Sequence, residues 1–381
     1  MANVLTDLAA DIYKAADVVG RELVGFIPSS TMNSDVSVRA AKGDVVRASF
    51  TREAAAVDVN ESMTVPEGTD QTVDNKVLTL DNSRAVQIPY TGEDIRSLNN
   101  GIGFETVYGD QIKQAMRTLV NEMEEDLAEE AYTNASRAFG TAGTTPFGSD
   151  FSEVAEIRQI LVDNGMPPND GQASLVINTL AGTNLRQLAE LQKANEAGGT
   201  DLLRQGTLLD LQGLMIKESA QVQKHTKGTG SSYLINGAVA VDGTSIGADG
   251  GSGTILAGDV VTFAADSDNK YVVGSALSGG SFDINAPGAR LALPDNNAIS
   301  IANSYAANVA FHRAALEIAM RAPAVPEGGD TADDAMTVVD PFSGLTFEVR
   351  VYKGYRKTMI EVASTWGVKA WKPDYISLLL G

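Results

Sequence analysis

The sequence lacks cysteine and has only two histidines, His225 and His312. Without cysteine the chain can form no disulfide bond, no thiolate zinc site and no cysteine nucleophile. A histidine general base would have to be one of these two residues. The composition therefore excludes disulfide-stabilised domains, thiolate metal modules and cysteine-dependent enzymes.

Basic residues are scarce relative to acidic ones. The chain has 29 Lys and Arg against 49 Asp and Glu, which gives a net charge of −20. A surface of this sign repels phosphate groups, so simple electrostatic binding to DNA is disfavoured.

Long apolar runs are also missing. No stretch approaches the ~20 apolar residues that a membrane-spanning helix needs. The first residues, MANVLTDLAADIYKAADVV, lack the basic start and apolar run of a signal peptide. We expect a protein made in soluble form in the cytoplasm. Hydrophobic residues still make up 43% of the 381, enough for a packed core in one large or two to three modest domains.

The first ninety residues predict appendages. Residues 3–25 have the apolar spacing of a helical arm, which the prolines and polar residues after it end. Residues 45–90 then predict strands around a polar connection whose tip lies at 65–68. A long two-stranded loop is marginal alone, so we expect it to lie on a neighbour.

Residues 102–138 carry the strongest helical pattern, with an acidic face opposite the apolar one. A second helix is predicted at 151–164, with Asp150 and Glu153 as a capping box and Gly165 as the stop. A short buried strand at 173–178, a helix at 179–195 and a turn and strand at 206–219 follow.

The composition changes to Gly, Ser, Asp and strand-forming residues between about 223 and 305. Short apolar runs alternate there with turn residues, which predicts a small all-β domain inserted into the chain. After it, alternating stretches such as LTFEVRVYK predict strands that complete a sheet begun earlier.

One motif resembles a hydrolase signature. Residues 243–247 (GTSIG) fit the G-x-S-x-G pattern around Ser245, but a nucleophile elbow needs a helix directly after the serine, and loop residues follow here. The glycine-rich stretch 247–254 lacks the Gly-Lys-Ser/Thr ending of a phosphate-binding loop. We expect no catalytic and no cofactor-binding residues.

A metal site is not expected either. Asp330, Asp333 and Asp334 follow no calcium-loop spacing and are interpreted as a solvated acidic turn. His225 is interpreted as part of a polar loop, and His312 as a packed or capped core histidine.

The charged residues suggest one intermolecular contact. The acidic helix face at Glu122–Glu130 is ordinarily just solvated surface. The basic residues of the 39–52 stretch could nevertheless pair with that face on a neighbouring subunit.

The order of these elements resembles the phage coat-protein fold typified by HK97, and most closely the P22 coat-protein type with an extra inserted β-barrel domain. The resemblance rests on SLVINTLAGTNLRQLAELQ, LLRQGTLLDLQGLMIKESAQV, GTILAGDVVTFA, NVAFHRAALEIAMRAP, DPFSGLTFEVRVY and WGVKAWKPDYISLLLG. Gly367, Val368 and Pro373 stand where that family has its closing G-V-x-x-x-x-P pattern.

The resemblance implies an α+β, HK97-like capsid fold with an inserted all-β domain. The implied divisions are an N-terminal arm (1–44), an E-loop with flanking strands (45–95), a P-domain with its spine helix (96–170), an A-domain in two parts (171–222 and 306–381) and the insertion (223–305). Lys76, the only lysine between 43 and 90, has nothing that marks it for a covalent cross-link, so none is expected.

The implied function is that of a major capsid protein, not an enzyme, that assembles with itself into hexamers and pentamers of an icosahedral head. Scaffolding and portal proteins are implied partners, and DNA would be enclosed without sequence-specific binding. A phage tail or adhesin-type structural β-protein is the alternative, and a hydrolase would rest on Ser245 alone. The candidates for intersubunit contact are Arg39, Arg47, Arg52, Pro66, Glu122, Glu125 and Glu129.

Overall fold

The computed structural model describes residues 24–51, 58–59, 61, 63–64, 73–99, 104–168, 170–192, 210–339 and 344–381. The predicted arm helix at 3–25 lies outside these residues except for its last two positions. The tip of the predicted loop at 65–68 also lies outside them. No helix of the described part is long and apolar enough to cross a membrane.

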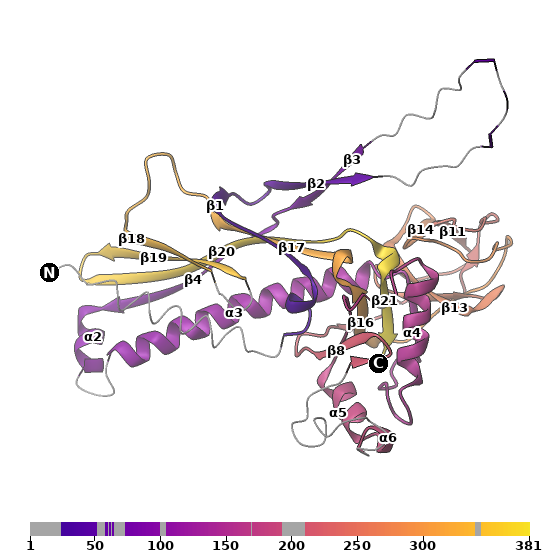
Figure 1. Ribbon diagram of the computed structural model, residues 1–381, viewed down its shortest axis with the longest axis horizontal. Coiled ribbons are helices and arrows are strands. Elements are labelled where there is room, and N and C mark those ends of the chain that lie inside the picture. Colours follow the sequence, from indigo (N-terminus) through magenta and orange to yellow (C-terminus); the bar gives the residue numbers. More distant parts are fainter. Residues whose placement is uncertain are drawn as a thin grey trace.

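A long helix and a six-stranded sheet form one half of the molecule (Figure 1). The strands of this sheet are β1 (Thr31–Ala40), β17 (Leu316–Pro323), β20 (Lys357–Ala370), β19 (Thr346–Gly354), β18 (Ala332–Val339) and β4 (Asn82–Thr91). Strand β20 is the centre: β4 pairs along one side, while β19 and β17 pair with successive parts of the other. Strands β1 and β18 form the outer edges next to β17 and β19.

Helix α3 (Phe104–Thr133) runs along this sheet, after the short helix α2 (Gly92–Asn99). Its apolar residues recur every three or four positions and are buried, among them Ile112, Met116, Leu119, Met123 and Leu127. They form one core with Trp366 and the apolar face of the sheet. The predicted helix is confirmed, but it ends at Thr133 and does not reach 138, since residues 137–139 form strand β5 (Arg137–Phe139).

A second sheet, with thirteen strands, forms the other half. Its body contains β21 (Ile376–Leu380), β16 (Tyr305–His312), β6 (Ala173–Ile177), β8 (Leu214–Glu218) and β7 (Asp210–Leu211). Helices α4 (Ser152–Asp163) and α5 (Thr179–Gln187) share a core with it, and α6 (Ala189–Gln192) follows α5. Residues 306–381 therefore contribute strands to both sheets.

The start of α4 differs from the prediction. Asp150 accepts hydrogen bonds from the backbone and hydroxyl of Ser152, while the Glu153 carboxylate accepts from the Phe147 N–H, so no capping box forms. Gly165 does end the helix, since its φ of +93° is favourable only for glycine.

Residues 223–305 contain β9 (Lys224–His225), β10 (Leu234–Ile235), β11 (Ser245–Asp249), β12 (Val260–Phe263), β13 (Asp266–Ser278), β14 (Ser281–Ile284) and β15 (Ile299–Ile301). The buried side chains that pack together here all lie between Tyr233 and Ile299. Strand β13 nevertheless joins the second sheet by pairing with β5, and Asn285 donates to the carbonyls of Thr133 and Ala135 (2.8 Å each) at the end of α3. The segment thus has a core of its own and a hydrogen-bonded attachment.

The separate core leads to the first prediction. Phe263 is fully buried, so Phe263→Ala should lower the free energy of unfolding by about 3–5 kcal/mol, and the loss should be confined to residues 233–299. Hydrogen exchange should show faster exchange there with α3 and β20 unchanged. Phe347→Ala, which opens the core under α3, is the matched control and should give the opposite pattern. Equal loss of protection in both halves after Phe263→Ala would contradict the prediction.

Candidate functional site

Helix α3 carries a carboxylate, Glu124, in the interior of the protein, where it is fully buried. Its Oε1 accepts hydrogen bonds from the backbone N–H groups of Gly25 (2.5 Å) and Phe26 (2.8 Å), and its Oε2 accepts from Ile27 (2.9 Å). Consecutive N–H groups of this kind form a concave site for an anion. Glu124 therefore joins the segment before β1 to the middle of α3.

Two further carboxylates of α3 hold other parts of the chain. Asp126 accepts from the indole N–H of Trp366 and from the Asn82 amide, both at 2.7 Å. Glu130 accepts from the backbone N–H of Ala370 at 2.9 Å. The acidic face, expected to be solvated, is thus partly structural.

Burial sets the acidity of these groups. It raises the pKa of Glu124, against the opposing effect of the Phe26 and Ile27 N–H groups. Burial also raises the pKa of Asp126, while the hydrogen bond from Trp366 opposes the rise. Burying a carboxylate charge is unfavourable, and the N–H groups offset only part of that cost.

Glu125 and Glu129 are the exposed acids of this face. Glu125 accepts a hydrogen bond from Gln223 at 3.0 Å. Glu122 is half-buried and lies 3.6 Å from the Arg84 guanidinium of its own chain. Of these three candidate contact residues, Glu125 and Glu129 present their carboxylates to solvent.

Arg39 is engaged within its own chain. Its guanidinium donates to both oxygens of Glu348 (2.6 and 3.2 Å) and to the Pro323 carbonyl (2.9 Å). Arg350 donates to the same buried carboxylate at 3.1 Å and also contacts Asp330. Arg39 thus belongs to an intrachain network at the end of β1, and its pairing with a neighbouring subunit stays a prediction.

Strands β2 (Val45–Thr51) and β3 (Val73–Thr79) form a two-stranded ribbon that projects from the body (Figure 1). At the base of the ribbon, Leu78 is buried in one cluster with Trp371. Gly367 allows β20 to pass close to the end of β3, because a Cβ at this position would lie 2.0 Å from the Thr79 carbonyl oxygen. Val45 and Val77 are 47% and 44% exposed. The ribbon is anchored on one face and open on the other.

Arg47 lies on the open face of the ribbon. It is exposed and pairs by register with Val77. The other candidate residues of the loop, Arg52 and Pro66, lie outside the described residues. The outer face at the base thus combines two apolar side chains with one cation.

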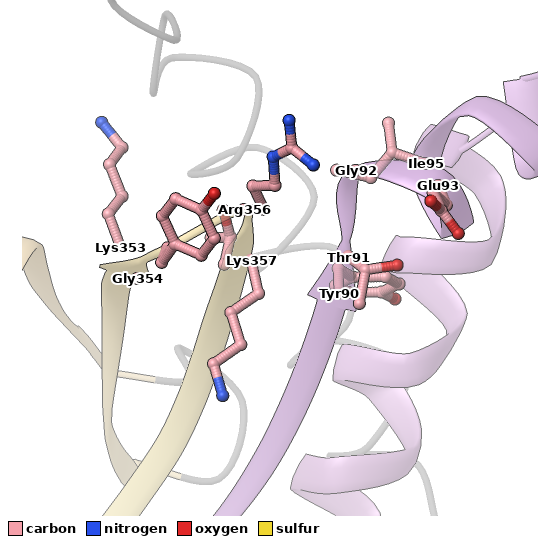
Figure 2. Close-up of a pocket in the computed structure, with 11 residues that line it drawn as sticks. Tyr90, Thr91, Gly92, Glu93, Ile95, Lys353, Gly354, Arg356 and Lys357 are labelled. Carbon is pink, nitrogen blue, oxygen red and sulfur yellow. The ribbon is translucent and has the colours of Figure 1, made fainter.

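The far end of the six-stranded sheet carries a basic turn. Lys353, Tyr355, Arg356 and Lys357 line an open hollow of about 740 Å³ between the β19–β20 turn and the start of α2. Figure 2 shows Arg356 between the turn and Gly92, with Lys353 and Lys357 pointing in other directions. Tyr355 is 89% exposed. Sequence reasoning missed this cluster, although Lys353, Arg356 and Lys357 lie within five consecutive residues of the chain.

The G-x-S-x-G motif around Ser245 lacks the geometry of a nucleophile elbow. Ser245 begins strand β11, and the residues after it continue that strand. His225 is buried, with Nε2 2.8 Å from Asp259 Oδ1, so its interpretation as a polar loop was wrong. His312 is packed as expected, with Nδ1 accepting from Ala314 N–H and Nε2 beside Asp170.

The acidic turn is paired with basic side chains of β19. Asp330 contacts Arg350, and Asp333 lies 2.5 Å from Lys353. Within the described ranges, no group of three or more potential ligands is arranged to hold a metal ion.

A pH dependence follows from Glu124. Because burial raises its pKa, the folded state binds this proton more tightly than the unfolded state. The resulting stabilisation is present below the ordinary pKa of glutamate and is lost as the pH rises through the raised pKa. The free energy of unfolding of the wild type relative to Glu124→Gln should therefore fall as the pH rises above the ordinary pKa of glutamate, as measured by urea titrations. A difference that grows with pH would show that the N–H bonds outweigh the burial.

Comparison with known proteins shows which solved structures have a similar fold. No family model matches the chain, and no curated protein matches its sequence. A chain of the capsid structure of cyanophage P-SCSP1u matches with a TM-score of 0.52 and 12% identity, over 94% of this chain and 88% of that one. A chain of Mycobacterium phage Che8 matches with a TM-score of 0.51 and 13% identity, over 93% and 90%. At this identity the likeness establishes the fold alone: the chain has the mixed α and β fold of phage capsid proteins.

Proposed function

We propose that this chain is the major capsid protein of a tailed bacteriophage. Its copies would assemble into the hexamers and pentamers of an icosahedral head that encloses double-stranded DNA. The observation that carries the proposal is the projecting β2–β3 ribbon on a capsid-type fold. The role is structural and not enzymatic.

The ribbon is the first contact surface of this proposal. Among the described residues β2 and β3 pair only with each other, which leaves the outer edge of each strand unpaired. A two-stranded ribbon alone is marginal, since it has too little burial to offset the entropy of ordering it. A neighbouring subunit against Val45 and Val77 would supply that burial.

Charge complementarity supports the same contact. Arg47 is exposed, and among the α3 side chains that the structure describes, Glu125 and Glu129 are the exposed acids. Arg39 is occupied by Glu348, so the proposed pairing with a neighbour's α3 falls to Arg47 and Arg52.

The basic turn is a second candidate surface. The described residues offer no ion-pair partner to Arg356 or Lys357, although the chain is strongly acidic overall. Exposed Tyr and Arg side chains are typical of binding hot spots. An acidic segment of another copy would complement this turn.

We further propose an HK97-like division of the chain, with the P22-type insertion at 223–305. The self-contained cluster between Tyr233 and Ile299 supports an inserted domain. The expected division assigns all of 306–381 to the A-domain; we propose instead that strands β17–β20 go with α3 and the P-domain, because they share one core with that helix. The net charge of −20 suits a wall that encloses DNA without holding it.

Microscopy of the purified or co-expressed chain tests the function. We expect closed shells in negative stain, with scaffolding and portal proteins as the partners that shape them. Fibres would favour the alternative of a tail or adhesin-type structural protein. Particles no larger than a monomer under all assembly conditions would overturn the capsid proposal.

Charge reversal tests the ribbon contact. The double variant Arg47→Glu, Arg52→Glu should impair shell assembly while the subunit keeps its fold, because both charges would then repel the neighbour's α3. Circular dichroism and sedimentation velocity measure the two properties. Lys224→Glu, exposed on the insertion, is the matched control and should assemble normally. Normal shells from the double variant would refute the pairing.

A further inference from the structure

Residues 25–40 form a continuous strap along one edge of the six-stranded sheet. They comprise the turn η1 (Ile27–Ser29), with the residues that precede it, and strand β1. Strand β1 pairs in parallel with β17 only, and its register is interrupted between Ser34 and Arg39. An edge strand with an interrupted parallel ladder is held weakly by its backbone hydrogen bonds alone.

A buried carboxylate holds the start of the strap. Glu124 accepts three backbone N–H groups, those of Gly25, Phe26 and Ile27. Gly25 fits closely, since a Cβ there would lie 2.6 Å from a methyl group of Val176. The Phe26 ring stacks on Phe311, with centroids 5.9 Å apart. These contacts join the strap to α3 and to the second sheet.

A second buried carboxylate holds the end of the strap. Glu348 is 2% exposed and takes two hydrogen bonds from Arg39. Strand β19, which carries Glu348, is not a hydrogen-bonded neighbour of β1. The bridge therefore spans the point where β17 ends and β19 begins, directly before the turn into the β2–β3 ribbon.

We propose that residues 25–40 can leave the sheet edge as one unit, and that Glu124 and Glu348 are the two latches that hold them in place. Asn33 of β1 also exchanges hydrogen bonds with Glu317 and Arg321 of β17, and these contacts break when the strap leaves. The ladder between β17 and β20 does not involve the strap and stays paired as before. Because the ribbon follows the strap at Val45, release of the strap changes the direction in which the ribbon projects. This inference does not depend on the proposed capsid function.

Hydrogen exchange on the full chain tests the unit. Removal of a buried acceptor costs about 1–3 kcal/mol, so Glu124→Ala should accelerate exchange across all of 25–40, including β1, by about 5- to 150-fold. Glu348→Ala should accelerate exchange in the same residues, although it acts at the other end. In both variants, exchange in α3 and β20 should stay as in the wild type.

Milder variants and controls complete the test. Gly25→Ala disturbs the first latch from the strap and not from α3, because the added Cβ would clash with Val176. It should accelerate exchange in the same residues as Glu124→Ala, and it serves as the test if Glu124→Ala folds poorly. Glu129→Ala, an exposed acid on the same helix, should change nothing in the strap. If each variant accelerates exchange only at its own end, the strap is not a unit. If α3 and β20 lose protection together with the strap, the carboxylates stabilise the whole fold and the latch proposal is overturned.

Discussion

Buried N–H groups need acceptors, and three carboxylates of α3 accept from backbone and side-chain N–H groups of chain segments that are far apart in sequence. Glu124 takes those of residues 25–27, and Glu130 takes that of Ala370. Asp126, between them, takes side-chain donors of Trp366 and Asn82. Less than two turns of helix thus hold the segment before β1, the start of β4 and the end of β20, which lie at the same end of the six-stranded sheet.

The sequence could predict α3, its apolar face and the strand at 173–177, because each depends on a local periodicity. It could not show that Glu124 is buried, because amphipathic analysis assigns every acid to the solvent side. A signal was nevertheless present. Glu124 stands four residues after Val120, three before Leu127 and seven before Ala131, all of which are buried. An acid at such positions has to find donors within the core.

The sequence could not predict which strands and side chains pair with each other, and the reason is a different one. Alternating apolar residues predict a strand, but they do not say which strand lies beside it. Strand β20 pairs with β4 across more than two hundred residues of chain, and Arg39 reaches Glu348 over a similar separation. All the candidate contact residues, Arg39 among them, stay predictions, although the sequence could not show that Arg39 has a partner in its own chain. The predicted capping box at Asp150 was wrong for a local reason, because the Asp150 carboxylate accepts the backbone N–H of Ser152.

The position of β21 has a consequence for how the protein is made. This strand lies between β5 and β16 in the larger sheet, parallel to the first and antiparallel to the second. Those two strands have no direct ladder between them, so they cannot close the sheet until residues 376–380 have left the ribosome. Helix α3 and β4 emerge much earlier and must wait with their apolar faces uncovered. Such a nascent chain is exposed to aggregation during synthesis, and chaperones that shield apolar surface would be needed most at that stage.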